Sequence, residues 1–321
     1  MKPNLSRRRT PFSRLTSWLL SMLSLVVLLA FTSSQALAVC ETSKFQDEDG
    51  NLAFLSEETC SEFPDVDAEL DWNSFDPGEW TGIQPYRTAT ATHLGWRFSG
   101  FEDAQATNSD TAFAGGTKQD DNCAMVKGGK APNKDDLKRA YISSKTVDGR
   151  VILNLAWVRI PQNTTSPSAH IGFEFNQAGE EDKDFCGVGS DGLVHRTEDD
   201  MLIVYDFEGG DDEPVISLRR WVVPTSPDPT CEVKSSSAPC WGPSITLTGL
   251  MVDGYPVAEA KVNTAISVDD EIGPSSLDTL GLKEFGEAGI DLTAAGVFEE
   301  GQCLAFGKAF AVSRSSGNSA K

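Results

Sequence analysis

Short runs of β-branched and aromatic residues, separated by clusters of Gly, Pro, Asp and Ser, recur along most of this chain. Such runs favour extended strands, and the residues between them favour turns. Representative runs are RVILNLAWVRI, AHIGFEFNQ, DMLIVYDF and VISLRRWVV. Their close, regular spacing predicts an all-β fold, a two-sheet sandwich of the jelly-roll or concanavalin-like kind.

Two segments interrupt the strand pattern and predict short helices. The first covers residues 134–144, where Asn133 can cap a helix that buries one apolar face. The second covers residues 277–285. Asp148 and Gly149 then form a hairpin-type turn before the strand that contains Trp157.

The N-terminus has the organisation of a secretory signal peptide. Arginines precede an apolar stretch at residues 18–31, and the small residues Ala36 and Ala38 flank Leu37. This pattern predicts cleavage after Ala38. An uncleaved membrane anchor and a lipoprotein modified at Cys40 are the alternatives.

The predicted organisation therefore has three parts. Residues 1–38 form the signal peptide, residues 39–70 an acidic, loop-like segment, and residues 71–321 a β-sandwich domain. The chain ends in SRSSGNSAK without an obvious terminal element, so we expect this domain to be truncated at its C-terminal end.

A strong negative charge limits the classes of partner. The formal net charge is −21, and it becomes −26 without residues 1–38, which hold five basic and no acidic residues. Nucleic acids and anionic membranes repel such a chain, whereas divalent cations do not. We therefore expect a secreted or cell-surface protein whose mature part is not embedded in a membrane.

The cysteines predict disulfides rather than a metal site. All seven follow residue 38, no CxxC pair occurs, and cysteines in an exported protein are usually oxidised. The pair that closes CEVKSSSAPC is the best defined. The predicted pairs are Cys231 with Cys240, Cys40 with Cys60, and Cys123 with Cys186, which leaves Cys303 unpaired.

Acidic side chains in two loops could ligate calcium, which prefers hard oxygen donors. Neither loop has EF-hand spacing, and a helix cap or a solvated hairpin explains the same residues. No other cofactor is expected. The calcium candidates are Asn133, Asp135 and Asp136 in the first loop, and Asp206, Asp211 and Asp212 in the second.

A second acidic group could act on a glycosidic bond, because glycoside hydrolysis uses two carboxylates that face one sugar linkage. A solvated loop is the simpler interpretation, and no catalytic residue is assigned. Neither HExxH nor GxSxG occurs. The members of this group are Glu174, Glu180, Asp182 and Asp184, of which Glu174 lies between Phe173 and Phe175 and is expected to face away from the core.

The order of several segments is familiar: APNKDDLKRAYISS, GRVILNLAWVRI, AHIGFEFNQ, HRTEDDMLIVYDFEGG, EAGIDLTAAG and CLAFGKAFAVSRSSGNSAK. This order resembles a family of bacterial secreted and cell-surface proteins. In that family, a large β-domain commonly precedes prealbumin-like repeats of the Cna-B or SpaA type. The resemblance covers residues 71–321 and implies location and architecture, because the family has no established catalytic residues.

The expected function is a non-enzymatic extracellular module for adhesion or ligand binding, with a glycan or a host or matrix protein as partner. A carbohydrate-active enzyme on the same sandwich is one alternative. A purely structural surface cap is the other.

Overall fold

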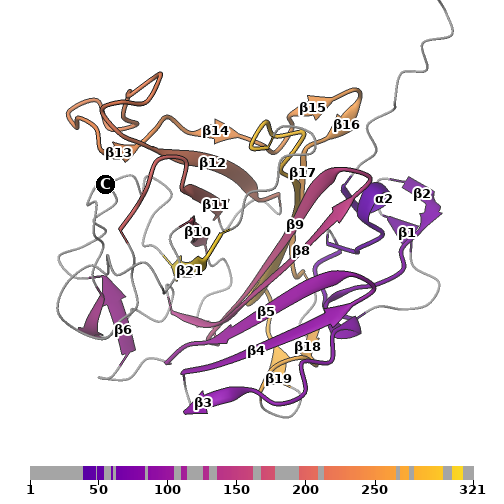
Figure 1. The fold of residues 1–321 in the computed structure, drawn as a ribbon. Helices are drawn as coiled ribbons and strands as arrows, with labels where there is room; N and C mark the ends of the chain where they lie inside the picture. The colour runs from indigo at the N-terminus through magenta and orange to yellow at the C-terminus, as the bar shows by residue number, and fades with distance from the viewer. Residues whose placement is uncertain are drawn as a thin grey trace, which may run out of the picture. The chain divides into compact units, whose positions relative to one another are not determined.

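The computed structural model describes residues 39–47, 49–53, 59–60, 63–83, 86–104, 110–113, 126–129, 136–161, 168–177, 195–208, 213–264, 268–274, 278–298 and 306–313. All of these residues belong to one compact unit, residues 37–321, and antiparallel strands dominate the described part (Figure 1).

One sheet has seven antiparallel strands. Their order across the sheet is β17-β20-β9-β8-β5-β4-β3, so β9 and β8 are central and β3 is an edge. The strands are β3 (Thr81–Ile83), β4 (Tyr86–His93), β5 (Trp96–Glu102), β8 (Leu137–Val147), β9 (Arg150–Arg159), β17 (Ala258–Val262) and β20 (Phe285–Asp291).

The other large sheet has six strands. Its order is β13-β12-β11-β10-β21, with β14 also paired to β12. The strands are β10 (Ala169–Asn176), β11 (Met201–Phe207), β12 (Val215–Val222), β13 (Cys240–Trp241), β14 (Ile245–Thr246) and β21 (Lys308–Ser313).

Smaller elements complete the described part of the chain. Four two-stranded sheets and two short helices lie outside the large sheets. The pairs are β1 (Thr59–Cys60) with β2 (Phe63–Asp67), β6 (Asp110–Phe113) with β7 (Val126–Gly129), β15 (Met251–Val252) with β16 (Tyr255–Pro256), and β18 (Val268–Asp270) with β19 (Asp278–Leu280); the helices are α2 (Val39–Ser43) and the 3-10 helix η1 (Trp72–Ser74).

The main hydrophobic core joins the two large sheets and makes the fold a sandwich. Leu155 and Trp157 of β9 belong to the same buried cluster as Ile171 of β10 and Tyr205 of β11. The rings of Trp157 and Tyr205 meet edge to face, with centroids 5.4 Å apart. The predicted all-β sandwich is confirmed.

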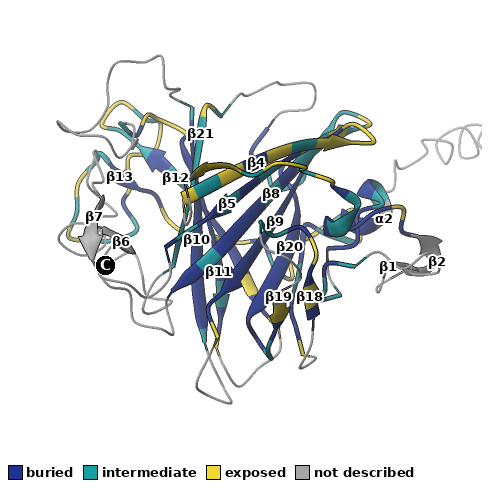
Figure 2. Cartoon of the chain, turned by 90° about the horizontal axis from the view of Figure 1, so that it is seen from below, coloured by how far each residue is buried: buried dark blue, intermediate teal, exposed yellow. Residues whose placement is uncertain are grey.

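A second core covers the other face of the seven-stranded sheet. Phe45 and Trp72, from the segment before β3, pack there in one buried cluster with Phe98 of β5 and Ile152 of β9. The central strands are therefore buried on both faces, as the dark ribbons of Figure 2 show. This explains why the β9 sequence is apolar at almost every position.

The two predicted helices are wrong. Residues 137–147 form strand β8, and residues 278–285 contain β19, a turn and the start of β20. Leu137 and Ala140 belong to the core between the sheets, whereas Tyr141 belongs to the core on the opposite face. A strand can bury both of its faces in this way, whereas an amphipathic helix buries one.

The predicted hairpin turn is confirmed. Val147 pairs with Arg150, and both intervening residues, Asp148 and Gly149, have positive φ angles of 50° and 86°. A two-residue turn of this kind matches the natural twist of the strands that it joins.

Two predicted disulfides are confirmed. Cys40 is bonded to Cys60, and Cys231 is bonded to Cys240. The other three cysteines, Cys123, Cys186 and Cys303, lie outside the described residues.

Candidate functional site

Glu174 lies on the outer face of the six-stranded sheet, as predicted. Its neighbours Phe173 and Phe175 point into the core between the sheets. Glu174 is nevertheless 8% exposed, so it is not a solvated surface acid.

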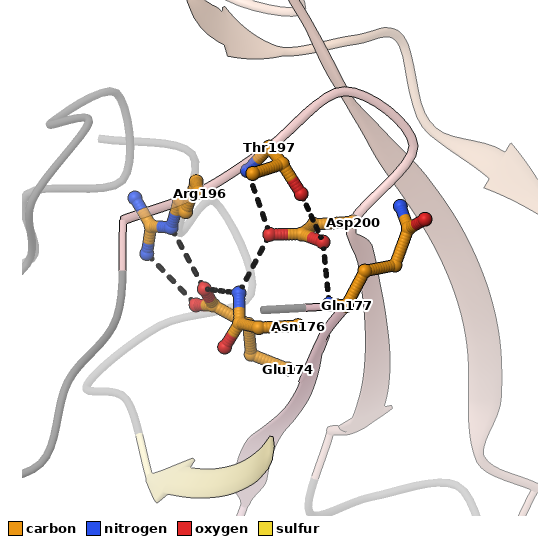
Figure 3. Close-up of polar contacts among 6 residues, drawn as sticks. All are labelled: Glu174, Asn176, Gln177, Arg196, Thr197 and Asp200. Carbon is orange, nitrogen blue, oxygen red and sulfur yellow. Dashed lines mark hydrogen bonds and ion pairs between the residues drawn. The ribbon is translucent and has the colours of Figure 1, made fainter. Parts of the chain in front are cut away.

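The partner of Glu174 is Arg196. The guanidinium Nε and Nη2 donate to the two carboxylate oxygens, both over 2.8 Å (Figure 3). The same guanidinium lies 5.1 Å from the ring centre of Trp221 and 5.0 Å from that of Trp241. The aromatic rings therefore stabilise a cation that a carboxylate also neutralises.

A second carboxylate joins this network. The Nδ2 of Asn176 donates to Glu174 and to Asp200, over 3.0 Å in each case. Asp200 also accepts hydrogen bonds from the main-chain N–H groups of Gln177 and Thr197, both over 2.8 Å, as Figure 3 shows. The network holds residues 195–200 against the end of β10.

This geometry limits the chemistry available to Glu174. A glycosidase pairs a proton donor with a second carboxylate across the scissile bond. Here every oxygen of Glu174 and Asp200 accepts at least one hydrogen bond from the protein. The arrangement is that of a structural ion-pair network. The other members of the predicted acidic group, Glu180, Asp182 and Asp184, lie outside the described residues.

The predicted calcium residues that are described have other surroundings. Asp206 Oδ1 lies 2.9 Å from Nδ1 of His170 on the neighbouring strand. Asp136 is buried, immediately before β8. The remaining candidates, Asn133, Asp135, Asp211 and Asp212, fall outside the part of the chain that the structure describes.

Two further findings concern metals and membranes. Among the described residues, no three His, Cys, Asp or Glu side chains are placed together so that they could hold one metal ion. Within the same residues, no helix combines the length and apolar character needed to cross a bilayer.

The most exposed part of the seven-stranded sheet lies at β4. Alternate residues of this strand, Tyr86, Thr88, Thr90 and Thr92, are all exposed and point to one side. Figure 2 shows this exposure along β4. These residues lie on the same face of the seven-stranded sheet that, further along at β9, packs against the six-stranded sheet. Among the described residues, however, neither β3 nor β4 contributes to the core between the sheets.

Neighbouring strands extend this surface. Ser99 lies opposite Thr90, Arg97 lies opposite Thr92, and Thr146 of β8 is exposed nearby. We call this set the hydroxyl surface: Tyr86, Thr88, Thr90, Thr92, Arg97, Ser99 and Thr146. From Ala140 to Thr146 on β8, and on β3, β4 and β5, no residue that points to this side is acidic.

The opposite side of β4 is fixed by packing and by an ion pair. Arg87 donates from Nε to Oε2 of Glu102 over 2.7 Å and from Nη2 to Oε1 over 3.2 Å. The hydrogen bond to Glu102 raises the pKa of Arg87. These contacts join β4 to β5, so the exposed threonines belong to a continuous sheet.

No family model, curated protein or solved structure matches this chain. The resemblance to bacterial surface proteins therefore stays a prediction, and the site must be judged on its geometry alone.

Sequence reasoning missed the partners in the Glu174 network. Arg196 and Asp200 precede β11, and no periodic pattern marks either residue. The threonine alternation TATAT at residues 88–92 is typical of a strand. It also carries an exposed hydroxyl stripe, which became visible once the covering sheet was seen to end before β4.

Proposed function

We propose that this protein is an exported surface module that binds a neutral glycan through the hydroxyl surface, without catalysing a reaction. The observation that carries the proposal is this uncovered, acid-free sheet face on a chain whose net charge is −21.

The chemistry of the surface matches a sugar. Each threonine hydroxyl is one donor and two acceptors, as is a sugar hydroxyl. Tyr86 is 47% exposed and offers an aromatic face for the apolar face of a sugar ring. The threonines recur every second residue on one strand, so the surface is extended and suits a chain of sugars better than a single small molecule.

Two observations support the proposed location. The described residues contain two disulfides, and disulfides persist in oxidising compartments such as the cell exterior. The signal-peptide pattern at residues 1–38 agrees with this location.

A binding experiment tests the proposal. The chain, produced with its disulfides formed, is screened against a glycan array and against insoluble cellulose, chitin and peptidoglycan. We expect binding to at least one neutral glycan. Thr90→Val keeps the β-branched shape and removes one hydroxyl, and Tyr86→Ala removes the ring. Each change should weaken binding by about 1–2 kcal/mol, roughly five- to thirtyfold.

The matched control is Thr246→Val, which removes an exposed hydroxyl from β14 of the other sheet. Its affinity should equal that of the unmodified chain. Equal loss in all three variants would remove the hydroxyl surface as the binding site. Failure to bind any glycan would favour a structural cap or a protein ligand.

A further inference from the structure

Several acidic residues are fully buried on the face of the seven-stranded sheet opposite the hydroxyl surface. Asp47, Asp71 and Glu287 each have an exposed fraction of 0%. The Asp47 carboxylate lies directly over Gly289 of β20: a Cβ atom on this glycine would stand 1.8 Å from Asp47 Oδ2. We call these three residues the buried acid cluster.

Glu287 ties the covering segment to the sheet. The N–H of Gly50 donates to its Oε1 over 2.7 Å, and Nε1 of Trp72 donates to its Oε2 over 2.9 Å. Burial raises the pKa of Glu287, and the charges of Asp49, Asp71 and Asp47 raise it further. These three acids are thus close enough to Glu287 for their charges to act on it.

Two neutral polar side chains at the same place lack partners. Asn154 of β9 and Ser143 of β8 are both 0% exposed. Among the described residues, no hydrogen-bond partner is found for Asn154 Oδ1, Asn154 Nδ2 or Ser143 Oγ. A buried polar group without a hydrogen-bond partner destabilises the folded state, so each of these groups calls for an explanation.

The strand register places these side chains beside the cluster. Asn154 is paired with Gly289 on one side and with Ser143 on the other. Directly opposed residues of an antiparallel pair point to the same side. Asn154 therefore points to the side on which Asp47 covers Gly289.

We propose that a calcium ion binds between the covering segment and the sheet, with Asp47, Glu287 and Asn154 Oδ1 as its protein ligands. Buried carboxylates are stable when a proton or a metal ion neutralises them, and calcium takes both carboxylate and amide oxygens. The ion would provide Asn154 with a partner and offset the charge of Asp71 nearby. This site differs from the two loops predicted from the sequence and is independent of the hydroxyl surface.

The described residues do not include three acidic side chains placed so that all three could bind the same metal ion. The coordination shell must therefore include neutral oxygens, such as Asn154 Oδ1, and main-chain carbonyl groups or water. Calcium accepts such mixed shells with six to eight ligands, whereas magnesium requires near-octahedral geometry and retains its water. A buried, mixed-ligand site therefore favours calcium.

The first experiment measures calcium-dependent stability. The chain is unfolded in EDTA with its disulfides intact, refolded, and melted at pH 7 with CaCl2, with MgCl2 or with chelator. A ligand that binds only the folded state raises the melting temperature. We expect a rise of about 5 °C or more at calcium near 100 times its Kd, and a smaller rise with magnesium.

A variant separates ligation from packing. Asp47→Asn keeps the side-chain shape and removes one buried charge. We expect it to melt at a higher temperature than the unmodified chain in chelator and to bind calcium about tenfold more weakly or worse, because affinity follows the charge of the ligands. Asp253→Asn, which removes an exposed acid, is the control and should leave both quantities unchanged.

A second measurement needs no variant. Terbium replaces calcium at oxygen sites and emits when a nearby tryptophan is excited, and the indole of Trp72 is bonded to Glu287. Sensitised emission that CaCl2 displaces at one ion per chain would support the proposal. No calcium-dependent rise in melting temperature and no displaceable emission would overturn it, and protons would then neutralise the cluster. A calcium shift that persists unchanged in Asp47→Asn would also overturn it.

Discussion

At the residue scale, the same carboxylate group has different surroundings in Glu174 and Glu287. Glu174 faces the guanidinium of Arg196, and its charge is compensated by the protein. Glu287 is surrounded by other acids, and burial is the largest cause of its raised pKa. Both glutamates occupy strands between apolar neighbours, so only the three-dimensional surroundings distinguish them.

The raised pKa of Glu287 predicts a pH dependence of stability. The folded chain retains this proton above the ordinary pKa of 4.5, whereas the unfolded chain has released it. In chelator, the free energy of unfolding should therefore fall as the pH rises from 4.5 through the folded-state pKa, by up to about 1.4 kcal/mol per pH unit. Urea unfolding across this pH range measures the slope.

Glu287→Gln removes the titrating group and should flatten that slope. Glu271→Gln changes an exposed acid and should keep it. An identical slope in Glu287→Gln and in the unmodified chain would assign the pH dependence to other groups.

At the element scale, the segment before β3 forms part of the core. Phe45 is fully buried and meets the rings of Trp72 and Trp96, with centroids 5.0 and 5.2 Å away. This segment closes the face of the sheet that the six-stranded sheet leaves free. It also supplies Asp47 and Gly50, so its packing determines whether the buried acid cluster exists.

Phe45→Ala should consequently destabilise the whole domain. Removal of a buried phenylalanine leaves a cavity and costs about 3–5 kcal/mol. The measurement is the free energy of unfolding from urea titration. Met251→Ala, which truncates a side chain that is 53% exposed, should change it by less than about 0.5 kcal/mol. Equal effects in the two variants would show that the segment does not fold with the sheet.

At the scale of the whole molecule, the disulfides restrict the unfolded chain. Cys40 and Cys60 are separated by 20 residues, and Cys231 and Cys240 by 9. In the chain-entropy model, the longer loop gives the larger stabilisation, about 3 kcal/mol for each bond with a modest difference between them.

Paired replacement tests this expectation. Cys40→Ala with Cys60→Ala should lower the free energy of unfolding by about 3 kcal/mol, and Cys231→Ala with Cys240→Ala by slightly less. Urea unfolding without reductant measures both losses. A loss below about 0.5 kcal/mol in each pair would contradict the model, because the folded chain would then be stable without either bond.

The sequence by itself determined the fold class, the Asp148–Gly149 hairpin, two disulfides and the direction in which Glu174 points. Each depends on local information: the alternation of residues along a strand, a turn that needs positive φ, or a short spacing between cysteines. Tertiary structure decided the rest. Residues 137–147 form a strand because apolar side chains pack on both of its faces. Asp47 lies near Glu287 although 240 residues of chain separate them. Such contacts depend on which strands become neighbours and which face each segment covers, and periodicity along one chain contains neither fact.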